Sequence, residues 1–387
     1  MKNIVFIVNS YHPSYSAIGT CIHNVIGEMS SKYNIIVIAK KNENSNVNQY
    51  YECTHIQYIN TMDNYIRNLL SERIKLAKGL KLKILKMAKF VIKGYGFISA
   101  ILKRTNIKKQ EVQAIYRALR KIDGEIEVII PTCLPFESLI ASVEYKKKIS
   151  GETKVIPFLF DKYSVNSTLH RTENNKKRKF QRHLLIEEST FEKCDKLIFV
   201  DSWRKHLNTY FQKYSNKFIR VEHPLIKQIE TNYNLSYDTN LINVVYTGAL
   251  YRKLRSPLKM LEVFENLITK DNGIVMHFYV TGDCDSIIQD YSRKYPQNII
   301  YYGKVKSDIA KSAIINGDIL LSIGNTDVTQ LPSKIFEYIS TGNPVIHFYS
   351  KKEDPVIKIL ERYKNALCVW NNDKNIEANI FGMVDNQ

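Results

Sequence analysis

Long hydrophobic runs are missing from this 387-residue chain. No window reaches the ~18 uninterrupted apolar residues that a membrane-spanning helix needs. The first residues, MKNIVFIVNSYHPSY, contain only a short apolar run before polar and turn residues, which is not typical of a signal peptide. The sequence therefore predicts neither a spanning helix nor a secretion signal in this stretch.

Cysteine pairs and several common binding motifs are also missing. The six cysteines are scattered without a CxxC pair, which argues against a disulfide framework and against a zinc site. No GxGxxG follows the first apolar run and no GxxxxGK[ST] occurs, so dinucleotide and P-loop chemistry are not expected. The basic segments do not alternate with aromatic residues, so the sequence predicts no nucleic-acid module.

Acidic residues are scarce in one part of the chain. The formal net charge is +18, and residues 67–121 hold 16 Lys or Arg against only two acids, Glu72 and Glu111. That stretch alone carries a net charge of +14. A local excess of this size indicates an anionic partner, such as a membrane surface or a phosphorylated substrate.

The basic part of the chain also has a helical pattern. Residues 73–93 predict one helix whose two faces differ. The apolar face holds Leu76, Leu80, Ile84, Met87 and Val91. The basic face holds Lys75, Lys78, Lys86, Lys89 and Lys93. Such a helix suits the surface of an anionic membrane. The alternative is an ordinary helix that covers a sheet and turns its lysines to solvent.

Apolar strand-like runs alternate with helical patterns twice along the chain. A polar stretch near residue 230 separates the two series. This order predicts an α/β fold of two doubly wound parallel-sheet domains, with a ligand at the carboxyl ends of the strands, in the cleft between the domains. We expect an N-terminal domain over 1–226 with a basic helical insertion at 63–122. A linker at 227–241 and a C-terminal domain over 242–387 follow.

One short helix in the second domain carries a candidate site, QLPSKIFEYISTGNPVI. Pro332 suits the first helical position, and Ser333 and Lys334 would lie at the positive end of the helix dipole, which favours anions. Glu337 lies about one turn further on, where its carboxylate can accept two hydroxyl hydrogen bonds, as from a ribose. Gly342 would end the helix. The alternative is a helix cap with a salt-bridged surface pair.

This stretch resembles the donor-binding helix of retaining GT-B glycosyltransferases, in particular glycosyltransferase family 4. Further motifs agree in order, among them VNSYHPSYSAIGT, FEKCDKLIFVDS, RVEHP, VVYTGALYRKLRSP and FYVTGD. The likeness spans nearly the whole chain and is strongest over 243–348. It implies two Rossmann-like domains: an N-terminal domain on the acceptor side and a C-terminal domain that binds a nucleotide sugar.

The resemblance also implies roles for individual residues. Glu337 would bind the ribose, while Ser333 and Lys334 would lie near the diphosphate. Arg255, with Arg252 and Lys253 as rivals, would neutralise the leaving diphosphate. The glycines Gly19 and Gly248 would let the backbone approach the donor. No metal is expected, because fixed cations and helix dipoles would stabilise the leaving group.

Two positions depart from the family pattern. Thr329 stands where members commonly have a second Glu, and Asp161 follows a strand where many have a His. Asp161 would contact sugar hydroxyls or the acceptor. These departures leave open which sugar is moved and whether one is moved.

Three other features are weaker candidates. Asp283-Cys284-Asp285 has the spacing of a metal-binding DxD, but it follows a plain turn. His12 lies in the first loop and is a weak candidate for a donor or acceptor contact. Residues 171–183 are expected to form a basic surface loop, which is either solvated or in contact with acceptor phosphate or lipid headgroups.

The sequence and its resemblance together predict a bacterial-type retaining glycosyltransferase. It would transfer a sugar from a nucleotide diphosphate sugar, such as a UDP sugar, to a lipid-linked or glycan acceptor. Surface polysaccharide synthesis, as of a capsule or exopolysaccharide, would be its setting, at the inner face of the cell membrane. Two alternatives stay open: an inactive subunit that assists another glycosyltransferase, and a GT-B epimerase acting on a free nucleotide sugar.

Overall fold

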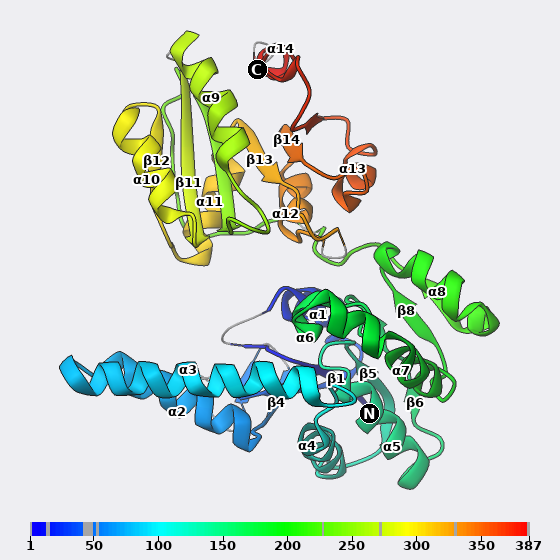
Figure 1. The fold of residues 1–387 in the computed structure, drawn as a ribbon. Coiled ribbons are helices and arrows are strands. Elements are labelled where there is room, and N and C mark those ends of the chain that lie inside the picture. The colour runs from blue at the N-terminus through cyan, green and yellow to red at the C-terminus, as the bar shows by residue number, and fades with distance from the viewer. Residues whose placement is uncertain are drawn as a thin grey trace. The chain divides into compact units, whose positions relative to one another are not determined.

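The computed structural model describes residues 2–12, 16–41, 49–51, 54–226, 228–270, 273–328 and 331–384. Thr329, the departure noted above, lies outside the described residues. The chain divides into two compact units, Met1–Pro224 and Leu225–Gln387. Each unit is built of helices packed on sheets (Figure 1). The predicted α/β architecture with parallel sheets in separate domains is confirmed.

The main sheet of the first unit has the strand order β3-β4-β2-β1-β5-β6. Its strands are β1 (Asn3–Val8), β2 (Asn34–Lys40), β3 (Gln49–Tyr51), β4 (Thr54–Ile59), β5 (Ile126–Pro131) and β6 (Lys154–Val155). Only β3 pairs antiparallel among the described strands. All residues of β1 are buried, as expected for a central parallel strand covered on both faces.

A smaller parallel sheet completes the first unit. It contains β7 (Phe158–Leu159), β8 (Leu197–Phe199) and β9 (Phe218–Arg220). The short strands β6 and β7 follow each other closely in the chain and belong to two different sheets. Pro157 lies between them and has no N–H for a ladder, which explains the interruption.

Helices surround these sheets. In chain order they are α1 (Ala17–Met29), α4 (Lys109–Arg120), α5 (Glu137–Lys148), α6 (Ser167–His170), α7 (Glu173–Phe191) and α8 (Arg204–Tyr210). The expected basic loop at 171–183 was wrong, because most of it forms the start of α7. The side chain of Thr172 caps this helix by accepting a hydrogen bond from the Asn175 N–H at 3.2 Å.

The first part of the insertion expected at 63–122 forms a helical hairpin of α2 (Met62–Leu76) and α3 (Gly79–Leu102), which lie side by side (Figure 1). The last part forms α4, which packs into the core of the first unit. The single helix expected over 73–93 was wrong. Ala77 and Lys78 have extended backbone angles, and Gly79 has a φ of 57°, which a glycine adopts at little cost. Lys75 and Leu76 therefore end α2, Lys78 is the N-cap of α3, and the other expected face residues belong to α3.

The second unit is a parallel sheet with the order β12-β11-β10-β13-β14-β15. Its strands are β10 (Ile242–Leu250), β11 (Ile274–Gly282), β12 (Ile299–Tyr301), β13 (Ile319–Ile323), β14 (Val345–Tyr349) and β15 (Ala366–Trp370). Its helices are α9 (Leu258–Lys270), α10 (Asp285–Lys294), α11 (Ser307–Asn316), α12 (Lys334–Thr341), α13 (Pro355–Leu360) and α14 (Ile376–Val384). The strand order reverses between β10 and β13, so their carboxyl ends form a switch point where ligands bind in such folds.

The polar stretch expected as a linker packs on the second unit. The Thr231 hydroxyl donates to the Asp308 carbonyl, and the Leu235 N–H donates to the Ser312 hydroxyl, both at 3.0 Å. The hydroxyls of Tyr237 and Tyr279 are also 3.0 Å apart. Along the chain, the boundary between the two units falls between Pro224 and Leu225, close to the expected end of the first domain at residue 226.

Candidate functional site

Gly248 lies near the carboxyl end of β10, at the switch point of the second sheet. Its φ is 135°, a conformation that side-chain-bearing residues rarely adopt. A Cβ atom on Gly248 would lie 3.9 Å from Cγ of Lys334, so the Lys334 side chain passes beside this glycine. The predicted glycine and the predicted lysine are therefore brought together.

Helix α12 begins at Lys334, with Ser333 as its N-cap, and Pro332 precedes the cap. The expectation that Pro332 occupies the first helical position was wrong. The Ser333 side chain makes no cap hydrogen bond. The helix ends as expected at Gly342, which has a φ of 83°.

Tyr338 fixes α12 against β10. Its hydroxyl accepts from the Thr247 N–H at 3.0 Å and donates to the Thr247 carbonyl at 3.1 Å. Burial raises the pKa of Tyr338, which keeps the hydroxyl protonated and able to donate. Tyr338 lies one turn after Lys334 in α12, so these bonds to the residue before Gly248 hold the helix, and with it Lys334, at the strand end.

Lys334 and Glu337 form an ion pair with Nζ to Oε2 at 2.6 Å. Their side chains are 35% and 27% exposed, so the pair lies at the surface of the site. The alternative of a salt-bridged pair is thus present in the structure. It does not exclude ligand binding, because a carboxylate has about four acceptor positions and the lysine uses one.

Arg255 is held at the same strand end. Its Nε and Nη2 donate to Oδ1 of Asn325 at 3.1 and 2.8 Å, and its Nη1 donates to the Ala249 carbonyl at 3.3 Å. The turn that carries it is closed by two backbone bonds between Tyr251 and Arg255. Thr326, next to Asn325, donates its N–H to the Leu254 carbonyl at 2.8 Å. This turn and the segment after β13 are therefore joined.

Of the two rival cations, Arg252 is bonded to the start of the α10 region. Arg252 donates its N–H to Oδ1 of Asp283 at 2.7 Å and its Nη2 to the Ser286 hydroxyl at 3.1 Å, both toward α10. Lys253 is exposed, and its carbonyl accepts from the Thr326 hydroxyl. The Asp283 carboxylate thus already accepts a hydrogen bond from the Arg252 N–H. Among the described residues, no group of three or more His, Cys, Asp or Glu could hold a metal ion.

In the first unit, Asp161 follows β7 at the carboxyl end of the smaller sheet. Burial raises the pKa of Asp161, and the neighbouring Lys162 opposes this shift. Burial raises the pKa of the Cys21 thiol to about 12, with a smaller contribution from Asp161, so Asp161 lies near the start of α1. A carboxyl in this place can accept hydrogen bonds from hydroxyl groups.

Gly19 lies in the first turns of α1. A Cβ atom on it would lie 2.2 Å from the Ser10 carbonyl oxygen. The close approach of α1 to the loop after β1 therefore requires a glycine, which is a reason internal to the chain. The expected approach of a donor to Gly19 stays a prediction, as does the role of His12 in that loop.

The helical hairpin exposes a continuous apolar stripe. Within residues 62–102, all of which the structure describes, no side chain is buried. The α3 stripe is defined by Leu80, Ile84, Met87, Val91, Tyr95, Ile98 and Leu102. Leu80 and Met87 are 74% and 70% exposed. The alternative of a helix that covers a sheet with its apolar face was wrong. In the part of the chain that the structure describes, no helix is long and apolar enough to cross a membrane.

The end of α3 is fastened to α7. The Asn175 amide donates to the Ala100 carbonyl at 3.1 Å, and Arg182 Nη1 donates to the Arg104 carbonyl at 3.2 Å. The buried Lys179 donates to Oδ1 of Asn106 at 2.7 Å. Cations at the carboxyl end of a helix also interact favourably with its dipole. The hairpin is thus anchored at its base and exposed along its length.

No protein-family model matches the chain, and no curated protein matches it. Its structure matches that of sucrose-phosphate synthase from Thermosynechococcus elongatus with a TM-score of 0.58 and 11% identity, over 100% of this chain and 90% of that one. It also matches the structure of the TarM G117R mutant of S. aureus, solved with fondaparinux, alpha-GlcNAc-glycerol and UDP. That match has a TM-score of 0.58 and 11% identity, over 100% of this chain and 93% of that one.

The chain has the GT-B fold. A putative UDP-N-acetylglucosamine 2-epimerase from Listeria monocytogenes also matches, with a TM-score of 0.54 and 8% identity, over 100% of this chain and 88% of that one. At these identities, the likeness establishes the GT-B fold alone.

Two residues of this GT-B site were missed from the sequence: Asn325, which holds Arg255, and Tyr338, which fixes α12. A signal for Asn325 was present, because it follows β13 at the carboxyl edge of the sheet, where functional side chains gather. Tyr338 had no such signal, since a tyrosine in a short amphipathic helix is usually a core residue.

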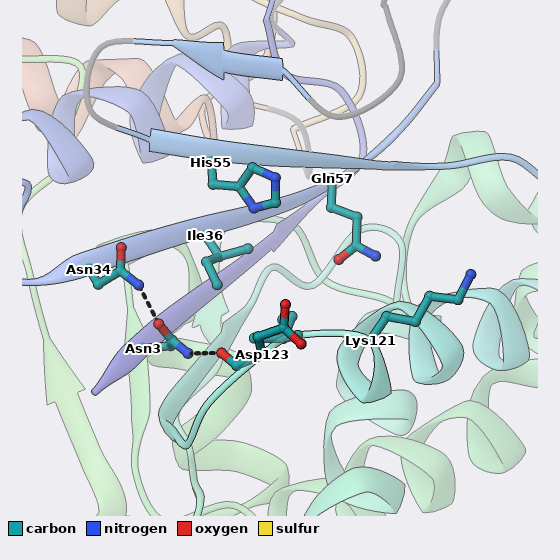
Figure 2. A pocket seen from close by; sticks show the side chains of 8 residues that line it. Asn3, Asn34, Ile36, His55, Gln57, Lys121 and Asp123 are labelled. Carbon is teal, nitrogen blue, oxygen red and sulfur yellow. Dashed lines mark hydrogen bonds between the residues drawn. The ribbon is translucent and has the colours of Figure 1, made fainter. Parts of the chain in front are cut away.

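A polar cavity of about 480 Å³ lies in the first unit (Figure 2). It is lined by Asn3, Asn34, Ile36, His55, Gln57, Lys121, Ile122 and Asp123. Asn3 and Asn34 begin β1 and β2, so the cavity lies at the amino ends of these strands. Ligands of doubly wound folds bind at the opposite, carboxyl edge, and none of the predicted site residues lines this cavity.

Proposed function

We propose that the chain is a retaining glycosyltransferase that uses a nucleotide diphosphate sugar, such as a UDP sugar, and a lipid-linked or glycan acceptor. The observation that carries this proposal is the gathering of Arg255 and Lys334 around Gly248 at the switch point of the second unit. Glu337 lies beside them in an ion pair with Lys334. Retention rests on the resemblance of the sequence to glycosyltransferase family 4.

The chemistry of the reaction suits these residues. Sugar transfer releases a nucleoside diphosphate, whose negative charge must be stabilised as the glycosidic bond to the leaving group breaks. Arg255 and Lys334 supply two fixed cations, and the start of α12 adds the positive end of a helix dipole. Gly248 has no side chain to keep the phosphates away. No metal is needed for this role in the proposal.

Glu337 would bind the ribose of the donor. One of its oxygens accepts from Lys334, and the carboxylate keeps capacity to accept hydrogen bonds from two hydroxyl groups. Asp161, in the first unit, would hydrogen-bond hydroxyls of the donor sugar or of the acceptor. Its place directly after β7, at the carboxyl end of a parallel strand, supports this role, because a carboxyl there can accept hydrogen bonds from sugar hydroxyls.

The α3 stripe supports a membrane-bound setting. Apolar side chains that lie exposed in a helical row, beside lysines and without any acid in α3, fit the surface of an anionic bilayer. We propose that the lysines Lys75, Lys78, Lys86, Lys89 and Lys93 contact lipid headgroups or acceptor phosphates. The protein would then attach peripherally to the inner face of a bacterial cell membrane and act in surface polysaccharide synthesis.

Ligand-dependent thermal stability tests the donor part of the proposal. The full chain is melted with a panel of UDP and GDP sugars, and with buffer alone. Binding to the folded state raises the melting temperature, because a ligand that binds only the folded chain stabilises it. We expect a rise with at least one nucleotide sugar. An unchanged melting temperature with all of them would overturn the proposal.

A GT-B epimerase is the second candidate function, favoured by the match to the putative 2-epimerase from Listeria monocytogenes. An epimerase acts on a free nucleotide sugar and has no use for an exposed apolar stripe. Conversion of a nucleotide sugar to its epimer without vesicles, and without release of nucleoside diphosphate, would favour it. Copurification with a second glycosyltransferase, without donor turnover by this chain alone, would favour the inactive-subunit alternative.

A further inference from the structure

We propose that Asn325 is a positioning residue for Arg255, which fixes the direction of the guanidinium toward a diphosphate without adding a counter-charge. This inference rests on the proposed function, because it concerns the same donor site. Asn325 itself is not proposed to touch the donor. It acts through Arg255: its neutral amide oxygen accepts hydrogen bonds from two N–H groups of the guanidinium, across the switch point between β10 and β13.

The contact between Asn325 and Arg255 is geometrically specific. One amide oxygen accepts from both Nε and Nη2, at 3.1 and 2.8 Å, which fixes the plane of the guanidinium. The Ala249 carbonyl accepts from Nη1 at 3.3 Å on another edge. A guanidinium has five N–H donors, so three are engaged by these two partners. The flexible arginine side chain is thereby ordered before any ligand arrives.

The groups that surround the guanidinium of Arg255 are the Asn325 amide oxygen, the Ala249 carbonyl and the buried Tyr246 hydroxyl. Among the described residues no carboxylate pairs with Arg255, so none of them neutralises its positive charge. An aspartate at position 325 would accept the same two N–H donors and would cancel that charge. The neutral amide of Asn325 therefore orients the guanidinium of Arg255 and leaves its positive charge available to bind an anion.

The backbone around Asn325 is itself well defined. Asn325 is 5% exposed. Gly324, before it, leaves no room for a side chain, since a Cβ atom there would lie 1.8 Å from Oδ2 of Asp354. Thr326, after it, bonds to the carbonyls of Leu254 and Lys253. The carboxyl end of β13 and the turn that carries Arg255 are thus held as one assembly.

Titration calorimetry with UDP, GDP, UMP and GMP tests the inference on the full chain. The wild type should bind at least one diphosphate more tightly than its monophosphate, because the second phosphate meets Arg255. Asn325→Asp should weaken diphosphate binding more than tenfold and monophosphate binding less than threefold. Asn325→Ala should act in the same direction, by about fivefold. Both changes should have less than a twofold effect when Arg255→Ala is already present.

Asn343→Ala serves as a matched control. This half-buried amide donates to the carbonyls of Ile314, Ile315 and Gly317 in the same unit, so its loss should lower the melting temperature. It should leave the ratio of diphosphate to monophosphate affinity unchanged. A thermal melt of each variant identifies any that does not fold. If Asn325→Asp does not fold, the inference is tested by the effect of Asn325→Ala on diphosphate affinity, measured alone and in the Arg255→Ala background.

The outcomes separate this inference from the proposed function. Diphosphate binding by the wild type that is unchanged in both Asn325 variants would overturn the positioning role alone. So would equal losses for diphosphate and monophosphate, or an undiminished effect of Asn325→Ala in the Arg255→Ala background. A wild type that binds none of the four nucleotides would overturn the proposed function, and this inference with it.

Discussion

At the residue scale, the ion pair of Lys334 with Glu337 lies at the centre of the proposed donor site. Both side chains are partly exposed, and ion pairs of this kind typically add less than ~1 kcal/mol to folding stability. The tertiary anchor of α12 is instead Tyr338, which bonds to the buried backbone of β10. Loss of Glu337 should therefore affect a ligand more than the fold.

The first prediction concerns Glu337→Ala. The affinity for nucleoside diphosphate should fall by roughly tenfold to a hundredfold, because losing hydrogen bonds to a charged group costs about 1.5–3 kcal/mol. The melting temperature without ligand should change little. Calorimetry and thermal melts measure the two effects. Glu377→Ala, which breaks an ion pair with Lys270 at 2.8 Å, is the control and should leave affinity unchanged. A marked loss of stability with normal affinity would contradict the binding role.

Glu137 is a second residue with a measurable consequence. Burial, with the nearby charge of Glu111 as the next cause, raises the pKa of Glu137 to about 7. Its Oε1 accepts from the Lys108 N–H at 2.8 Å, at the start of α4. Glu111 in turn pairs with Lys40 at 2.6 Å. A largely buried carboxyl thus fixes the chain where the helical hairpin ends.

The second prediction follows from that raised pKa. The folded chain keeps the Glu137 proton up to about pH 7, whereas the unfolded chain releases it near the ordinary value of 4.5. The folded state thus binds more protons between these values, and its stability falls as pH rises through them. Glu137→Gln removes this term and keeps the acceptor for Lys108. Over that window, the unfolding free energy of the variant should rise relative to wild type by about 3 kcal/mol.

Urea denaturation of both proteins at pH 5 and pH 8 measures this difference. Burial lowers the pKa of His223 and of His277 to about 4, which changes stability with pH in the opposite direction. Both proteins contain these histidines, so their contribution cancels in the comparison. Parallel pH profiles for wild type and Glu137→Gln would show that Glu137 does not titrate in this range.

At the element scale, the α2–α3 hairpin shows what helical periodicity can and cannot predict. The spacing of apolar residues identified the face that is exposed in α3, from Leu80 to Val91. It did not reveal the break before Gly79, because a glycine can adopt either a helical or a positive φ and the apolar pattern does not distinguish the two. It left open whether this face covers a sheet or is exposed, because that depends on contacts far apart in the sequence.

The third prediction separates the two faces of α3. Leu80→Asn with Ile84→Asn and Met87→Asn should abolish binding to anionic vesicles at all salt concentrations, because each apolar side chain buried in the bilayer contributes about 1.5–3 kcal/mol. Lys86→Glu with Lys89→Glu and Lys93→Glu should weaken binding mainly at low salt, since each lysine contributes about 1 kcal/mol. Vesicle flotation at low and high salt measures both.

The control for this prediction is a charge reversal in the second unit. Lys351, Lys352 and Lys374 are exposed. Their replacement by Glu changes the net charge as much as the α3 variant does, and it should leave flotation unchanged. Equal losses in the two charge variants would indicate a non-specific effect of net charge. Flotation that survives the Asn variant would contradict docking through the α3 stripe.

Element boundaries were predictable where local chemistry decides them. Gly342 ends α12 as expected, since its left-handed conformation suits glycine. The division of 154–160 into β6 and β7 has a local sign in Pro157, but the assignment to two sheets depends on partner strands. Thr172 is a typical N-cap residue, so the start of α7 could also have been predicted. The high charge of the segment favoured the incorrect prediction of a surface loop. Arg255, Lys334 and Glu337 could be placed together because carboxyl ends of parallel strands meet at one edge.

At the scale of the whole molecule, the two series of strands and helices predicted two α/β units. The stretch at 228–241 looked like a free linker because it is polar and has no period. It packs on the second unit through single hydrogen bonds and a tyrosine pair, which leave no pattern in the sequence. The GT-B fold follows from the whole arrangement, and the chain's activity is a separate question.

Transfer itself is the fourth prediction and tests the central claim most directly. The full chain is incubated with labelled UDP and GDP sugars and with anionic vesicles that carry lipid-linked glycan from bacterial membranes. We predict that one nucleotide sugar gives labelled lipid and an equal amount of released nucleoside diphosphate, and that both products disappear with Arg255→Ala. Binding without release of nucleoside diphosphate from any sugar, or release that Arg255→Ala leaves unchanged, would contradict the account.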